Sequence, residues 1–181
     1  MTPSQRHHLL ELARWSIEHG IQSGRKLRHQ ETDAELCYPA ATFVTLNLNG
    51  ELRGCIGSLA AHRNLTDDVV ENAYSAAFRD PRFTPVTARE LAQLEIHISI
   101  LSPTEPLQFQ NEADLLQQLR PGIDGLVLEA GHHRGTFLPQ VWEQLPEPVD
   151  FLAHLKRKAG LPMSYWSPTL RVERYTVESI P

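Results

Sequence analysis

The sequence predicts an α+β fold in which helices pack on a mainly antiparallel sheet, within a single domain of two lobes. Two pairs of β-rich runs are each joined by a short turn signal, which is typical of antiparallel hairpins. Segments of helical periodicity follow each pair, instead of alternating with single strands as in parallel α/β folds. The 181 residues, 41% hydrophobic and 22% charged, suffice for one sizeable core and include no low-complexity tract.

The N-terminal segment predicts a helix over residues 4–20 that packs on the rest of the domain. Ser4 can cap this helix, and Gly20 can end or kink it. Apolar residues recur between them at helical spacing, namely Leu9, Leu12, Ala13 and Ile17. The following stretch, residues 22–38, is polar and poorly periodic, so we interpret it as a connection.

The clearest hairpin joins residues 41–48 to a strand that runs from residue 51 to about residue 59, across the turn signal Asn49-Gly50. Its register decides which way each side chain points, because a slip of one residue sends every side chain to the opposite face.

Two registers of this hairpin compete. A two-residue turn would place Cys55 opposite Val44 and bring a charge, Arg53, onto the leucine face. A three-residue loop would segregate the faces, with the pairs Leu46–Leu52, Val44–Gly54 and Thr42–Ile56. We predict the second register, in which Arg53 and Cys55 share the face of Phe43 and Thr45.

A helix with a stripe of small apolar residues follows the hairpin. Asp80-Pro81 ends it, because proline disfavours an α conformation in the residue before it. Thr87 and Glu90 form a capping box that predicts a second, short helix. A strand over residues 95–101 completes this half.

The C-terminal half repeats much of this order. A helix, a hairpin, two helices and a closing strand are predicted, over residues 111–119, 125–130 with 135–138, 139–145 with 149–159, and 170–180. This order is compatible with two β-β-α-α-type structural repeats, although no sequence repeat of fixed period accompanies it.

Composition excludes several classes of function. A net charge of −5 and a pI near 6.0 disfavour nucleic acid as a partner, since phosphate binding needs clustered positive charge. No apolar run reaches membrane-spanning length, and residues 1–14 lack the apolar core of a signal peptide. We therefore expect a cytoplasmic protein with no membrane partner. Cys37 and Cys55 form no CxxC pattern, and we expect both to be free thiols.

Cys55 is the candidate catalytic residue, because a cation such as Arg53 would favour its nucleophilic thiolate. Gly54 and Gly57 are candidate ligand-binding positions, since glycine lets a ligand or another backbone approach a strand closely. The alternative is that Cys55 and Arg53 are both structural. Cysteine is often buried for packing alone, and Arg53 could pair with a structural carboxylate.

Asp80-Pro81-Arg82-Phe83 is the second candidate segment. Arg82 offers a planar fork suited to a carboxylate or phosphate, and Asp80 is its nearest structural partner.

No metal site and no cofactor are expected from the remaining motifs. His132 and His133 are adjacent, so they do not present the same face to one ion. His62 and His97 could be brought near Cys55 by folding, but their spacing does not require it. The sequence contains no Gly-rich phosphate loop, no HExxH and no GxSxG.

The hexapeptide over residues 52–57, Leu-Arg-Gly-Cys-Ile-Gly, resembles the signature of the AMMECR family. Further segments look like family segments in the family's order, namely residues 80–83, 125–128, 136–141 and 151–160. The similarity runs from about residue 41 to residue 175.

This resemblance implies one AMMECR domain over residues 1–181, an α+β fold and a groove near the hexapeptide. Prokaryotic members are called AmmeMemoRadiSam system protein A, which implies a Memo-like protein and a radical SAM enzyme as partners. The motif positions that carry over are Arg53, Cys55, Asp80 and Arg82.

Two functions follow as hypotheses. The first is an accessory module that binds a small ligand or a partner at the hexapeptide face. The second is a small enzyme that uses Cys55, with Arg53 or Arg82 recognising an anionic substrate. The exposure of Cys55, and a histidine or carboxylate within its hydrogen-bond reach, would distinguish them.

Overall fold

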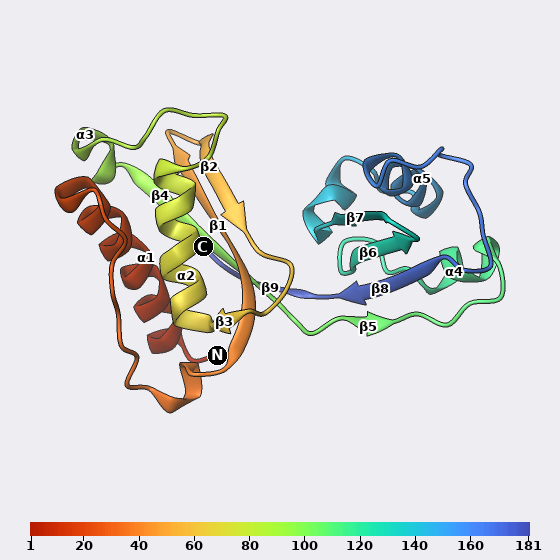
Figure 1. Cartoon of the computed structure of the whole chain (residues 1–181), viewed down its shortest axis with the longest axis horizontal. Helices are drawn as coiled ribbons and strands as arrows, with labels where there is room; N and C mark the ends of the chain where they lie inside the picture. The colour runs from red at the N-terminus through yellow and green to blue at the C-terminus, as the bar shows by residue number, and fades with distance from the viewer. The chain divides into compact units, whose positions relative to one another are not determined.

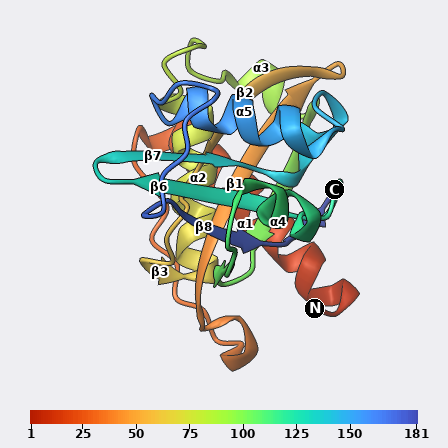
Figure 2. The ribbon, with the colours of Figure 1, turned by 90° about the vertical axis from the view of Figure 1, so that its right-hand side faces the viewer.

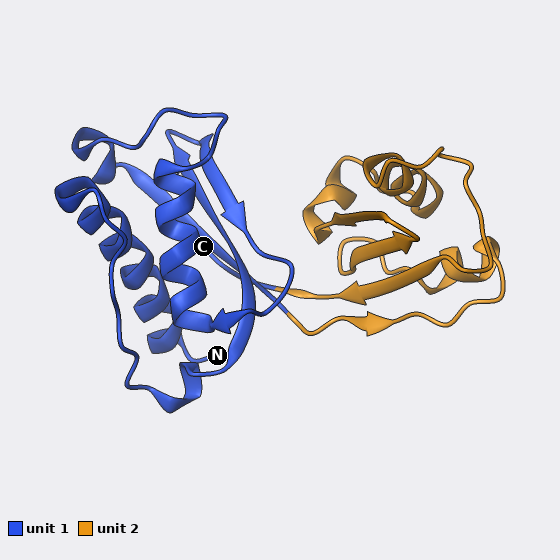
Figure 3. Cartoon of the chain, in the orientation of Figure 1, with its two compact units in different colours: residues 1–101, 178–181 blue, residues 102–177 orange.

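The computed structural model describes residues 1–181, which form two compact units (Figure 3). Unit 1 comprises Met1–Leu101 with Glu178–Pro181, and unit 2 comprises Ser102–Val177. Five helices and two antiparallel sheets confirm the predicted α+β class. None of the helices is long and apolar enough to span a bilayer.

Unit 1 is built on a sheet with the strand order β2-β1-β4-β9, to which β3 adds by pairing with β1. Helix α2 packs on β1 and β2, and α1 packs on α2 and β4, so both helices lie on the same side of the sheet (Figure 1). The elements are α1 (Pro3–Ser23), η1 (Ala34–Leu36), β1 (Pro39–Leu48), β2 (Glu51–Gly57), β3 (Arg63–Asn64), α2 (Leu65–Phe78), α3 (Ala88–Leu91), β4 (Leu94–Leu101) and β9 (Val177–Ile180).

Helix α1 differs from its prediction at both ends. Thr2, not Ser4, is the N-cap, and its hydroxyl accepts a hydrogen bond from the Gln5 amide. The helix continues past Gly20 and ends at Gly24, whose φ of 68° is the left-handed conformation that glycine adopts most easily. Gly20 serves packing instead, because a Cβ there would lie 2.3 Å from the Phe78 ring.

The predicted register of the first hairpin is wrong. The turn has two residues, since Leu48 pairs with Glu51, and Asn49 and Gly50 both have positive φ. A bulge then leaves Arg53 unpaired and shifts the register by one residue. Cys55 consequently lies opposite Thr45. It is therefore on the predicted face of the strand, but the bulge places it there, not a three-residue loop.

The longer remaining elements of unit 1 follow the sequence, whereas the short elements η1 and β3 were not predicted. Helix α2 ends before Asp80-Pro81, and the capping box of Thr87 and Glu90 begins α3. Strand β4 covers the predicted strand. The core between helices and sheet is aliphatic and includes Leu12, Val44, Leu46, Val69 and Ile98.

Unit 2 has a second sheet with the order β5-β8-β6-β7. Figure 2 shows β7, β6 and β8 side by side in that order. Its core is centred on Phe151, which stacks on Trp142 with ring centroids 3.7 Å apart. The elements are β5 (Glu105–Pro106), α4 (Glu112–Gln118), β6 (Gly125–Ala130), β7 (His133–Phe137), η2 (Pro139–Glu143), α5 (Pro148–Lys158) and β8 (Arg171–Tyr175).

Three features of unit 2 differ from the sequence prediction. Strand β5 was not anticipated, and the segment after β7 is a 3-10 helix where an α-helix was expected. The predicted closing strand over residues 170–180 is divided, because β8 pairs within the sheet of unit 2 and β9 within that of unit 1.

The two sheets nevertheless share a strand order. In unit 1 a hairpin, two helices and a strand give the order β2-β1-β4, and in unit 2 the corresponding elements give β7-β6-β8. In both, the first hairpin strand is flanked by its hairpin partner and by the later strand. This agrees with the two β-β-α-α-type repeats indicated by the sequence.

Candidate functional site

Cys55 lies on β2, the edge strand of the unit 1 sheet, on the face opposite α2. The adjacent residue, Gly54, faces the helix so closely that a Cβ would lie 2.2 Å from the backbone oxygen of Ala76. Gly57 is equally crowded, with a Cβ position 2.2 Å from the Phe43 ring. At both glycines, the protein's own atoms occupy the space that a side chain would need.

The thiol of Cys55 is half-buried and accepts a hydrogen bond from Thr45 Oγ1 at 3.3 Å. Thr45 also pairs with His97 on β4, so Cys55, Thr45 and His97 form a row across three strands. With strands about 4.8 Å apart, Cys55 and His97 are separated by roughly 10 Å. Within unit 1, no histidine or carboxylate makes a hydrogen bond to the sulfur.

The backbone of Cys55 is held by the segment after α2. As β2 is an edge strand, its outward N–H and C=O lack a strand partner. The Cys55 N–H donates to Asp80 Oδ2 at 2.9 Å, and Arg82 Nη2 donates to the Cys55 carbonyl at 3.3 Å. Asp80 and Arg82 thus replace a neighbouring strand at this one residue.

Asp80 and Arg82 also bind each other through two parallel bonds. Arg82 Nε donates to Oδ1 at 2.9 Å and Nη2 to Oδ2 at 2.7 Å. The carboxylate is buried while the guanidinium is half-exposed. The Arg82 hydrogen bonds, opposed by burial, hold the pKa of Asp80 well below its usual range. The pair is ionised at any physiological pH.

Arg53, the bulge residue, is anchored to a carboxylate of α3. Its Nε donates to Glu90 Oε1 at 2.7 Å, and its side chain is only 13% exposed. Hydrogen bonds from Arg53 and from Thr87 outweigh burial and lower the pKa of Glu90 to about 2. This is the structural pairing that the sequence left open for Arg53. One atom of the fork, Nη1, is buried without a partner.

A third carboxylate, Asp68 of α2, fixes the end of β2. It is fully buried, and its Oδ2 accepts from the Ser58 hydroxyl at 3.2 Å and from the Thr42 amide at 2.9 Å. Sequence reasoning missed this group because it lies on the buried side of a helix, ten residues after Ser58. Together, Glu90, Asp80 and Asp68 hold β2 from Arg53 to the residue that follows its end, Ser58.

An α+β protein with a braced cysteine strand at a sheet edge is thus the class that fold and site define. The family model of AMMECR1 matches residues 10–180. The chain belongs to the AMMECR1 family.

Relatives and a solved structure agree with this assignment. A protein of Methanothermobacter thermautotrophicus is 38% identical over 173 residues, covering 94% of this chain and 90% of the relative. A protein of Thermotoga maritima is 36% identical over 166 residues, covering 90% of each chain. The crystal structure of the uncharacterized protein PH0010 from Pyrococcus horikoshii matches with a TM-score of 0.85 and 33% identity. That match covers 95% of this chain and 88% of PH0010.

Proposed function

We propose that the protein is an accessory binding component that acts with Memo-like and radical SAM proteins and presents β2 to a partner or small ligand. The observation that carries this proposal is that the carboxylates near β2 bind the strand itself. Glu90, Asp80 and Asp68 are all committed to holding β2 in place. A braced strand whose thiol has no acid or base within hydrogen-bond reach suits recognition better than catalysis, which needs such a group beside the nucleophile.

The exposed residue of this strand that best suits a contact is Leu52, which is 44% exposed. Large exposed apolar side chains are favourable anchors at protein interfaces when other groups around them are fixed. The partner surface is therefore expected to contact β2 near Leu52 and the half-buried row that begins at Cys55.

Reconstitution with the Memo-like and radical SAM proteins of the same host tests the proposal. We expect Leu52→Ser to weaken the complex by about tenfold while leaving folding intact, because exposed substitutions rarely change stability by more than about 0.5 kcal/mol. Val149→Ser is the matched control, since Val149 is 56% exposed but lies in unit 2. Calorimetric titration, with metabolite profiling of material purified from the host, gives the readout. Equal affinities for both variants, or no binding by the wild type to either protein or to any metabolite, would contradict it.

A second function, a cysteine-dependent enzyme, is favoured by one observation. The Thr45 hydroxyl donates to the Cys55 sulfur, and the half-exposed guanidinium of Arg82 lies beside the same residue. The hydroxyl would orient the sulfur, and the guanidinium would attract an anionic substrate. Expressing the wild type or Cys55→Ser in a host that lacks the gene distinguishes the two functions. If the protein is a cysteine-dependent enzyme, only the wild type should restore the altered metabolite pools. If it is an accessory component, Cys55→Ser should restore them fully as well.

A further inference from the structure

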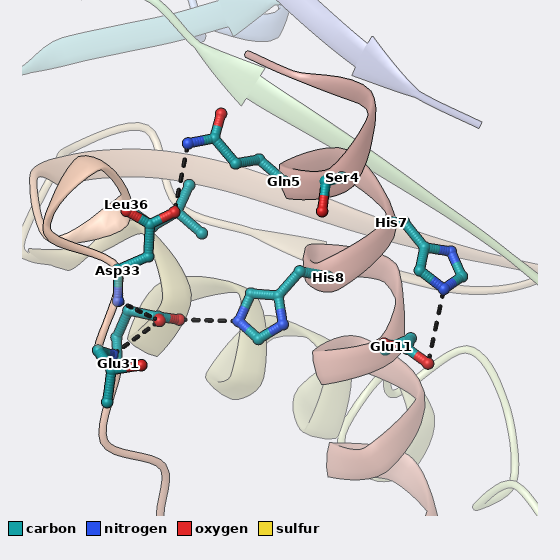
Figure 4. Close-up of a pocket in the computed structure, with 9 residues that line it drawn as sticks. Ser4, Gln5, His7, His8, Glu11, Glu31, Asp33 and Leu36 are labelled. Carbon is teal, nitrogen blue, oxygen red and sulfur yellow. Dashed lines mark hydrogen bonds and ion pairs between the residues drawn. The ribbon is translucent and has the colours of Figure 1, made fainter.

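Away from β2, two histidines and a glutamate converge beside the first half of α1. His8 comes from the helix, whereas His29 and Glu31 come from the connection that precedes β1. One nitrogen of each imidazole and one oxygen of the carboxylate lie within 4.8 Å of one another. Figure 4 shows His8 reaching across a pocket to Glu31.

The distances within this group suit a shared metal ion. His8 Nε2 lies 2.9 Å, and His29 Nε2 3.2 Å, from Glu31 Oε2. Ligand atoms at about 2.0–2.1 Å from a tetrahedral zinc ion are about 3.3 Å apart. Each imidazole nitrogen thus needs to move away from the carboxylate oxygen by only about 0.1–0.4 Å to reach that separation.

The carboxylate is oriented toward the imidazoles by backbone donors. Glu31 Oε1 accepts from the amides of Thr32 and Asp33, each at 2.8 Å, which leaves Oε2 for His8 and His29. A ligand fixed by such outer hydrogen bonds is typical of metal sites in proteins.

The adjacent pocket attracts cations. It has a volume of about 330 Å³ and is lined by the acids Glu11, Glu31 and Asp33 but by no lysine or arginine. His8 also borders it, with a side chain that is 33% exposed, so an ion can enter from solvent.

We propose that His8, His29 and Glu31 bind one divalent first-row transition-metal ion, with Zn²⁺ as the favoured occupant. Two imidazole nitrogens and one carboxylate oxygen suit zinc, cobalt and nickel, and they disfavour Mg²⁺ and Ca²⁺, which prefer oxygen ligands. The ion would join α1 to the connection between residues 25 and 38, which otherwise has one short 3-10 turn. His8 lies outside the residues matched by the family model.

Titration of the untagged, EDTA-treated full chain with Co²⁺ tests this site, because a low-coordinate cobalt ion has visible d–d absorption. We expect saturation at one Co²⁺ per chain, displacement by Zn²⁺ and no competition from Mg²⁺. Thermal unfolding should shift to higher temperature with Zn²⁺, since an ion bound only by the folded state stabilises it.

Two ligand variants and one control test the assignment. Glu31→Gln keeps an amide oxygen for the backbone donors, and we expect it, like His29→Ala, to weaken Co²⁺ binding by more than about tenfold. His132→Ala, an exposed turn position of unit 2, should bind as the wild type does. Circular dichroism confirms that each variant is folded. The proposal is overturned if the wild type takes up no Co²⁺, or if folded Glu31→Gln binds it as tightly as the wild type.

Discussion

Asp80→Asn is the substitution that examines the bracing of β2 most closely. The carboxylate accepts four hydrogen bonds, from the Cys55 amide and from three nitrogens of Arg82. An amide in its place has one oxygen, so it loses the two bonds to Oδ2 and turns an N–H toward donors. Hydrogen bonds to a charged group contribute about 1.5–3 kcal/mol each. Because Arg82 is half-exposed and can turn to water, we expect a loss of about 3 kcal/mol.

A loss of this size corresponds to a fall in Tm of about 6–12 °C for a chain of this length. Hydrogen exchange with mass spectrometry should also show weaker protection in residues 51–57, with little change in unit 2. Asp67→Asn is the matched control, since Asp67 lies at the exposed start of α2. The reasoning is refuted if Asp80→Asn lowers Tm no more than this control does.

Three further predictions concern unit 1. Gly54→Ala should cost at least about 2 kcal/mol more than Gly24→Ala in urea unfolding, because its methyl group meets the Ala76 carbonyl, whereas Gly24 borders open space and its substitution carries only the strain of a left-handed φ; equal costs would exclude the predicted clash. Glu31 and Glu90 have pKa values near 2 when folded and 4.5 when unfolded. Each therefore contributes on the order of 3 kcal/mol that is complete above about pH 5 and lost as the pH falls toward 2. Glu90→Gln should flatten this acid dependence, and an unchanged slope would refute the assignment. Arg53→Lys should destabilise unit 1 by about 1–2 kcal/mol, because lysine cannot reproduce the fork on Glu90; a Tm within 1 °C of the wild type's, well inside the about 2 °C that this loss implies, would contradict it.

Local signals in the sequence predicted much of the fold. The turn Asn49-Gly50, the stop at Asp80-Pro81 and the capping box at Thr87 each act over a few residues, and each appears where expected. The strand order of the two sheets also agrees with the inferred duplication. Such features depend on backbone preferences that can be predicted from neighbouring residues alone.

The errors arose where tertiary packing decides. The bulge at Arg53 exists because the side chain reaches Glu90 on α3 while Gly54 stays against α2. No short-range pattern reports that combination, so the register of the hairpin was misjudged. Gly20 was misread for the same reason, since its role depends on the Phe78 ring of another helix.

The candidate site was predicted as a set of residues but not as an arrangement. Cys55, Arg53, Asp80 and Arg82 do meet around β2, yet the partners Thr45 and Glu90 come from pairings that only the folded chain defines. The cluster of His8, His29 and Glu31 was missed because His29 and Glu31 lie in a polar connection without periodicity, beyond the end of the helix that carries His8. Histidines 21 residues apart carry no spacing signal for a shared ion.

Thiol reactivity tests the central claim, that β2 is a braced binding strand and not a catalytic one. Alkylation of the native chain by iodoacetamide at neutral pH, followed by mass spectrometry, compares Cys55 with Cys37, an exposed free thiol of the same molecule. A braced, half-buried thiol without a neighbouring base should be labelled no faster than Cys37. Labelling of Cys55 more than about tenfold faster than Cys37 would contradict the account and establish an activated nucleophile.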